Sequence, residues 1–439
     1  MLILLGGCHR DFLDKRPNMA EIRPESIADV QAMLDNTSIM NESSSSKILA
    51  TIGADEYYYT IEEWRRLATA TYRNGYLWNK EVFEGEESLD WNYGYQKILY
   101  CNIALETLEK ITPTKTEEID YNRAKGTALF HRSFVFYELL QLFGKPFIPN
   151  GNNNTLGIVL KLDAEIDKNP GRATVAECYA QIILDLSLAK DLLNEEVVNK
   201  NRPSKYAVMA LLCRVFLAVG EYQEAAVLAE ELIALIPLID YTTYLKETTH
   251  SFPMDTELNP EVIFRSMIRY GVTQLNYSLS EELLDLYDDN DTRQNLFFRM
   301  NNNKPVFCGS YYGSTSSFSG LAIDEVHLIG VECYLHLDLL GTAIEKLAFF
   351  QSKRYYELSE LVEDKETLID IVFEERRKQL LLRGTRWEDL RRLGFVLNRD
   401  VFLERPEIDG VAAVLSPRSD RYVWRLSDSA IDLGGLEQN

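Results

Sequence analysis

The chain between residues 128 and 143 is apolar around nearly the whole circumference of the helix that it predicts. A helix of this kind has no face suited to water, so other elements must enclose it. Apolar positions at helical spacing recur along much of the remaining chain, and they predict the helices that would do so. The sequence therefore predicts an all-α body packed around residues 123–147.

A second strong pattern, at residues 371–393, predicts two helices joined by one tight turn. Gly384 supplies a residue that adopts positive φ easily and ends the first helix. Five residues of this corner are expected to have structural roles: Glu375, Arg376, Arg386, Trp387 and Asp389. As an alternative, Arg386 and Trp387 would clamp a sugar. The structural role is favoured because a guanidinium beside Trp at a helix start usually satisfies carboxylates and carbonyls in a packed corner.

Residues 205–237 have the spacing of a tetratricopeptide-like helix pair. Small residues stand where the two helices would cross, Gly220 stands at the turn, and Pro237 follows the second helix. A weaker repeat of this pattern runs from Ile323 to Ala343. One good repeat and one faint repeat are too few for a solenoid, so the helix pairs are expected to be built into a larger body.

We expect a short N-terminal segment, residues 1–8, followed by one structural unit, residues 9–439. Within that unit, helical-repeat segments are expected at about 86–143, 172–240 and 322–393. Less regular, loop-rich segments, which would carry the ligand site, are expected at about 37–85, 250–320 and 394–439.

The formal net charge of -22 argues against a nucleic-acid or anionic-lipid partner, because both would be repelled. On this basis a neutral or cationic ligand is the easier partner. The chain contains 24 Tyr, a residue whose flat apolar face and polar tip suit contact with sugars, although part of this excess must lie in the core.

The sequence has no motif that predicts catalysis or a cofactor. It contains no phosphate-binding loop, zinc-protease helix, nucleophile elbow or dinucleotide fingerprint in a supporting context. The five cysteines after Cys8 are widely spaced, so we expect neither a disulfide framework nor a metal site.

The first eight residues end in Leu5-Gly6-Gly7-Cys8, which resembles a bacterial lipobox with Cys8 as the lipid acceptor. No basic segment precedes it, so we expect a late start or a truncated signal. The alternative is a buried N-terminal strand. No later stretch approaches the roughly 20 apolar residues of a membrane span, so membrane contact is expected through the lipid alone.

Residues 375–392 resemble the ER-x-x-EL-x-x-EG-x-RW-x-DL-x-R signature of the SusD/RagB family of outer-membrane nutrient-binding lipoproteins. Gln379 and Arg383 depart from it, since the family usually has Glu at both positions. Four other segments also resemble the family: the FLD tether after Cys8, the helix around Phe136, the helix pair at Leu212, and the C-terminal Gln438-Asn439. The resemblance thus touches most of the chain.

This resemblance implies a cell-surface protein that binds an oligosaccharide or polysaccharide without altering it. It also implies delivery of that nutrient to a SusC-like TonB-dependent transporter in the outer membrane. The family's sugar contacts lie outside its motifs, so candidates come from expected exposure alone. They are Tyr57, Tyr58, Trp78, Asn79, Tyr311, Tyr312 and Phe318, each of which would otherwise pack in the core or contact the transporter.

Two alternative functions stay open from the sequence. The first is a helical-repeat surface lipoprotein that binds a protein or peptide. The second is a surface glycoside hydrolase, for which a chance pair among the 68 Asp and Glu would have to serve as acid and base.

Overall fold

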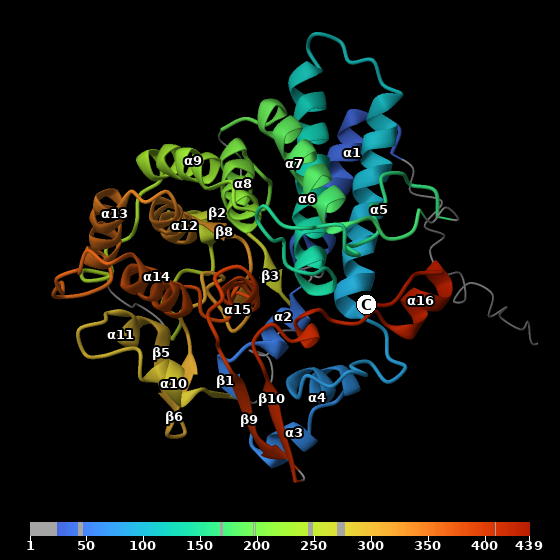
Figure 1. Cartoon of the computed structure of the whole chain (residues 1–439). Coiled ribbons are helices and arrows are strands. Elements are labelled where there is room, and N and C mark those ends of the chain that lie inside the picture. Colours follow the sequence, from blue (N-terminus) through green and yellow to red (C-terminus); the bar gives the residue numbers. More distant parts are fainter. Residues whose placement is uncertain are drawn as a thin grey trace, which may run out of the picture.

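The structure is a computed structural model that describes residues 24–42, 47–166, 170–195, 197, 199–244, 249–269, 277–408 and 410–439 (Figure 1). Cys8, the whole of segment 1–8 and the tether from Phe12 to Pro17 lie outside these ranges. The predictions made for them are therefore not addressed by the fold.

The fold is all-α, as predicted, with helices that carry most of the regular structure. The longer helices are α5 (Leu89–Glu109), α6 (Glu118–Phe143), α7 (Val175–Leu192), α8 (Lys205–Val219), α9 (Tyr222–Leu235), α12 (Ile323–His336), α13 (Leu340–Ser352), α14 (Lys365–Gln379) and α15 (Arg386–Phe395). The shorter ones are α1 (Ile27–Leu34), α2 (Ile48–Gly53), α3 (Ile61–Arg65), α4 (Ala70–Tyr76), α10 (Glu281–Leu284), α11 (Arg293–Phe297) and α16 (Asp428–Gly434).

Helix α6 is the central helix that the apolar run predicted. All of its residues from Gly126 to Phe143 are buried, and α5 and α7 run along its two sides with α1 beside them (Figure 1). Arg132 fastens the three longer helices together. Its guanidinium donates to both carboxylate oxygens of Asp185 on α7 at 2.8 and 2.9 Å and to Asn102 on α5 at 2.9 Å.

A second group of helices contains the predicted helix pair, α8 and α9, with α12, α13 and α14 packed beside it (Figure 1). Gly220 ends α8 in the left-handed conformation, with φ of 83°, which a residue without a Cβ adopts at little cost. Helix α12 contacts α8, α9, α13 and α14. Contacts between α7 and α8 join the two groups.

The strands are short, and among the described residues they form antiparallel two-stranded pairs. These are β1 (Tyr57–Tyr58) with β4 (Ser278–Leu279), β2 (Val262–Phe264) with β8 (Leu321–Ala322), β3 (Met267–Ile268) with β7 (Ser317–Phe318), β5 (Phe298–Asn301) with β6 (Lys304–Phe307), and β9 (Leu403–Ile408) with β10 (Val411–Leu415). Segment 250–320, expected to be loop-rich, contributes β2 to β7. Several aromatic side chains of this segment, among them Tyr311, Tyr312 and Phe318, are buried.

Within the described ranges, we find no helix long and apolar enough to cross a lipid bilayer.

Candidate ligand-binding pocket

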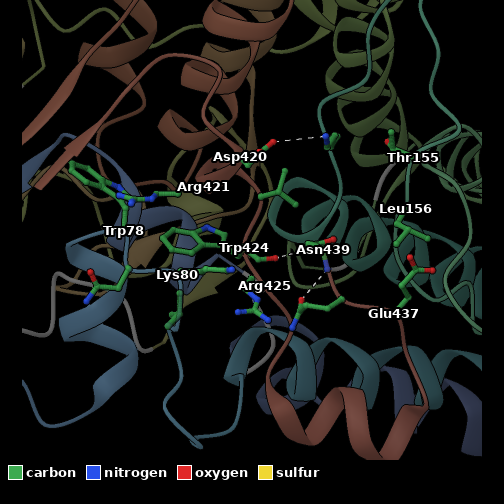
Figure 2. A pocket seen from close by; sticks show the side chains of 15 residues that line it. Trp78, Lys80, Thr155, Leu156, Asp420, Arg421, Trp424, Arg425, Glu437 and Asn439 are labelled. Carbon is green, nitrogen blue, oxygen red and sulfur yellow. Dashed lines mark hydrogen bonds and ion pairs between the residues drawn. The ribbon is translucent and has the colours of Figure 1, made fainter.

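A pocket of about 640 Å³ opens where three distant parts of the sequence meet: the turn after α4, the loop after α6 and the C-terminal segment around α16 (Figure 2). Its lining residues are Trp78, Asn79, Lys80, Val82, Lys145, Thr155, Leu156, Asp420, Arg421, Val423, Trp424, Arg425, Glu437, Gln438 and Asn439. The volume falls in the range of roughly 300–1,000 Å³ that is typical of sites for small ligands.

The indole rings of Trp78 and Trp424 support the wall of the pocket. Trp78 has φ of 52°, which a bulky side chain rarely adopts, so its surroundings must hold it there. Its Nε1 donates to Gly53 O at 2.9 Å, and the guanidinium of Arg405 lies 4.7 Å from its ring. Trp424 stacks on Trp387 with 5.1 Å between ring centroids and an angle of 21°. Both side chains are almost completely buried, with Trp78 0% and Trp424 2% exposed, so they support the pocket wall and present no open ring face.

The C-terminal wall of the pocket is held by hydrogen bonds to backbone groups. Trp424 N donates to Leu142 O at 2.9 Å, which ties the segment to α6. The side-chain amide of Gln438 bonds both backbone groups of Leu426, accepting from N and donating to O, each at 2.9 Å. Arg172 donates to Glu437 O at 3.0 Å and to the Asn439 side chain at 2.7 Å. The wall is therefore fixed before any ligand arrives.

The rim of the pocket is polar and carries more cations than carboxylates. Its charged lining residues are Lys80, Lys145, Arg421, Arg425, Asp420 and Glu437. Arg425 forms an ion pair with Glu81, and Lys145 lies 3.8 Å from Asp420. The exposed side chains of Lys80 and Arg421 have no partner in the part of the chain that the structure describes.

Trp78 and Asn79 are the two sequence-based candidates that line the pocket. The side chain of Asn79 is exposed, and its Nδ2 donates to Asn74 Oδ1 at 3.0 Å, which leaves its own oxygen free to accept. Whether either residue touches a ligand stays a prediction.

Tyr57 and Tyr58 belong to β1 and do not line the pocket. Tyr57 is 1% exposed and its hydroxyl donates to Ile52 O at 3.1 Å, so the expectation that its ring stands free was wrong. Tyr58 is half-buried and pairs with Ser278 across the strands.

Tyr311, Tyr312 and Phe318 are buried, at 0%, 8% and 1% exposure, and the expectation that they project from a loop was also wrong. Arg383 lies over the ring of Tyr311 at 4.2 Å and over that of Phe318 at 5.3 Å. The guanidinium of Arg265 lies 4.0 Å from the ring of Tyr312. Burial raises the pKa of Tyr311 well above its usual value. Attraction between each guanidinium and the ring faces helps to hold these aromatic side chains in place.

The corner between α14 and α15 lies behind the pocket, and none of its five signature residues lines it. Arg386 donates to both oxygens of Asp55 at 2.8 and 2.9 Å, and Arg376 donates to Asp389 at 2.9 Å. Trp387 is fully buried and contacts the pocket only through Trp424. This geometry matches a structural role better than a sugar clamp.

Glu375 accepts hydrogen bonds from Gln351 at 3.0 Å and Tyr355 at 2.7 Å. Burial alone would raise the pKa of Glu375, but the charges of Arg293 and Lys378 outweigh it and lower the pKa to about 2. The carboxylate is therefore ionised and paired.

The two departures from the family signature share one partner. Gln379 Nε2 donates to Asp324 Oδ2 at 2.8 Å, and Arg383 donates to both oxygens of Asp324 at 3.1 and 2.8 Å. Asp324 on α12 thus supplies the carboxylate that pairs with both residues.

Sequence reasoning did not single out Lys80, Lys145, Asp420, Arg421, Trp424 or Arg425 as site residues. The C-terminal segment offered one signal, since Arg421 and Arg425 flank Trp424 in a chain with an acidic excess. Their meeting with Lys80 and Lys145 depends on the fold.

Comparison with known proteins gives one consistent result. Residues 11–217 match the profile of a SusD-like family described as "Starch-binding associating with outer membrane". SusD-like protein P2 of Formosa agariphila is 32% identical over 143 residues, which make up 32% of this chain and 26% of that protein. The matched part thus spans about a quarter of that relative.

Solved structures extend the likeness to nearly the whole chain. A SusD superfamily protein from Bacteroides thetaiotaomicron superposes with a TM-score of 0.77 at 23% identity, covering 94% of this chain and 99% of that one. A SusD-like carbohydrate binding protein from Bacteroides vulgatus has a TM-score of 0.71 at 18% identity, covering 94% and 97%. Residues 11–217 are thus similar to a SusD-like family, and nearly the whole chain shares the fold of a SusD superfamily protein.

Proposed function

We propose that this protein binds an oligosaccharide nutrient in the pocket beside Trp78 and Trp424. The observation that carries the proposal is the pocket itself, which combines apolar lining residues with a polar rim in a volume of about 640 Å³. The family description names starch, and the Bacteroides vulgatus neighbour is called a carbohydrate binding protein. Both support a glycan ligand.

The lining suits the two kinds of surface that a sugar presents. The apolar lining residues Leu156 and Val423 supply contact for the C–H groups of a ring. Asn79 and the basic side chains of the rim supply donors and acceptors for hydroxyl groups. Because the wall is held by its own hydrogen bonds, binding would cost little ordering of the protein.

We further propose that the protein acts at the outer-membrane surface, anchored by lipid on Cys8, and passes the glycan to a SusC-like TonB-dependent transporter. The family description, which includes association with the outer membrane, supports this location. The proposal assigns no catalytic role to the chain, so the glycan should be released unchanged.

A glycan array followed by calorimetry tests the binding proposal. We expect the protein to retain at least one oligosaccharide, and Asn79→Ala to lower the affinity for it about fivefold through loss of one hydrogen-bonding side chain. Asn301→Ala, at an exposed position on β5 away from the pocket, is the matched control and should bind as the wild type does.

Either of two results would overturn the proposal: no glycan retained, or equal affinity in Asn79→Ala and the control. Chromatography of the recovered glycan checks that it is unchanged, and shortened products would contradict the assignment of binding without catalysis.

A further inference from the structure

The charge of the pocket is opposite in sign to that of the chain. The whole sequence has 46 Lys and Arg against 68 Asp and Glu. The lining of the pocket has four cationic side chains, Lys80, Lys145, Arg421 and Arg425, against the two carboxylate side chains of Asp420 and Glu437. Cations that gather in one concave site of an acidic protein call for a local explanation.

Ion pairs within the protein neutralise only part of this positive charge. Arg425 is paired with Glu81. Lys145 and Asp420 are 3.8 Å apart with side chains 55% and 98% exposed, so their pairing is weak in water.

Lys80 and Arg421 are exposed and have no side-chain partner among the described residues. Figure 2 shows both of them near the rings of Trp78 and Trp424. Two free cations thus stand beside the apolar part of the pocket.

We propose that the glycan bound in this pocket is anionic and carries carboxylate or sulfate groups. This inference rests on the proposed function. The guanidinium of Arg421 would bind a carboxylate or sulfate through paired N–H groups, and the ammonium of Lys80 would act as a second point of positive charge. The sugar ring that bears the anionic group would lie over the apolar part of the pocket lining.

The acidity of the whole chain does not oppose such a ligand at contact distance. At physiological ionic strength charges are screened over about 8 Å, so most of the acidic surface is too distant to act on a bound anion. Cations within hydrogen-bonding reach of a bound anion lie well inside that distance, so their attraction outweighs the repulsion from the distant acidic surface. The expectation of a neutral or cationic ligand, drawn from net charge, therefore does not apply to this pocket.

The test uses an array that holds neutral starch oligosaccharides, uronate-bearing pectin oligosaccharides and sulfated carrageenan oligosaccharides. We expect the full-length protein to retain glycans of the uronate or sulfate class more tightly than maltohexaose. The two anionic arms distinguish carboxylate from sulfate as the recognised group.

Charge variants then test whether the affinity for the anionic glycan depends on the cations of the pocket. We expect Lys80→Gln/Arg421→Gln to lower the affinity for the retained anionic glycan by at least about tenfold, as loss of charge-assisted hydrogen bonds requires. The control Arg66→Gln/Lys115→Gln removes two exposed positive charges outside the pocket, so the net charge changes equally. It should stay within about twofold of the wild type, because distant surface charges are screened. Equal unfolding midpoints in both variants would show that neither effect comes from misfolding.

The outcomes separate this inference from the proposed function. Retention of neutral glycans alone would overturn the anionic ligand and leave glycan binding standing. Equal loss of affinity in the two double variants would also overturn it, because the effect would then follow net charge rather than the pocket. Retention of no glycan would overturn both proposals.

Discussion

The hydroxyl of Tyr311 lies in a buried polar network. It is 2.6 Å from the hydroxyl of Tyr241 and donates to Glu261, while Gln379 Nε2 donates to it at 3.3 Å. In a network of this kind a group that loses its partner pays the full cost of burial, so each member supports the others.

We expect Tyr311→Phe to lower the free energy of unfolding by about 1–2 kcal/mol, because it removes the hydroxyl and leaves Glu261 with fewer donors. Denaturant unfolding measures this. Tyr356→Phe is the control, since Tyr356 is 58% exposed and should change stability by less than about 0.5 kcal/mol. Glycan affinity should be unchanged in both variants. An affinity loss in Tyr311→Phe at unchanged stability would return Tyr311 to the binding site.

No sequence pattern predicts the role of Arg405. Its guanidinium donates to the backbone carbonyls of Tyr57 at 2.8 Å, Ala54 at 2.6 Å and Tyr76 at 3.2 Å. It also lies over the ring of Trp78. A strand from the C-terminal hairpin thus positions a residue of the pocket wall, although more than 300 residues separate the two in sequence.

At the scale of elements, the turn between α14 and α15 depends on a buried carboxyl group from an N-terminal segment. Glu56 Oε1 accepts from Leu382 N at 2.8 Å, and Leu382 has φ of 57°. Burial raises the pKa of Glu56 from 4.5 to about 7, with the neighbouring charge of Asp55 acting in the same direction. The turn is therefore held by a group that favours its protonated form.

This shift predicts a pH dependence of stability. The folded state binds the proton of Glu56 more tightly than the unfolded state, so its contribution is complete below about pH 4.5 and is lost as pH rises through about 7. Between pH 5 and 7.5 the wild type should lose about 2 kcal/mol of unfolding free energy relative to Glu56→Gln, which does not titrate.

Denaturant unfolding at a series of pH values measures this difference. Glu62→Gln, at an exposed position on α3, is the control and should follow the wild type. Parallel pH curves for Glu56→Gln and the wild type would show that the pKa of Glu56 is not raised in the folded protein.

The helices and strands also show which parts of the fold local sequence patterns can predict. The helix around Phe136, the helix pair with Gly220 at its turn and the α14–α15 corner were all predictable. Each of them rests on residue spacing within a few turns of helix. The short strands β2 to β7 were not predictable as a set. Apart from the local β5–β6 hairpin, these strands pair with segments distant in sequence, which a local pattern does not contain.

At the scale of the whole molecule, the proposed anchoring at the membrane rests on Cys8. We expect Cys8→Ala, expressed with its complete signal, to move the protein from the outer-membrane fraction to the soluble fraction, because a body without its acyl chains has little hold on lipid. Fractionation and immunoblotting measure this. The wild type should also co-purify with a large outer-membrane barrel protein, and a variant that stays in the membrane without Cys8 would contradict lipid anchoring.

By itself, the sequence determined the all-α body, its central helix, the locked corner and the resemblance to SusD-like proteins, because helical periodicity and short motifs are properties of neighbouring residues. Only the tertiary structure decided which aromatic rings lie at the surface and which charges meet. The sequence placed Tyr311 in a loop, but in the structure its ring is buried beneath Arg383 and its hydroxyl donates to Glu261. Lys80 and Arg421 share a pocket only because the fold brings the turn after α4 to the C-terminal segment. Exposure and convergence depend on distant parts of the chain, and no local pattern encodes them.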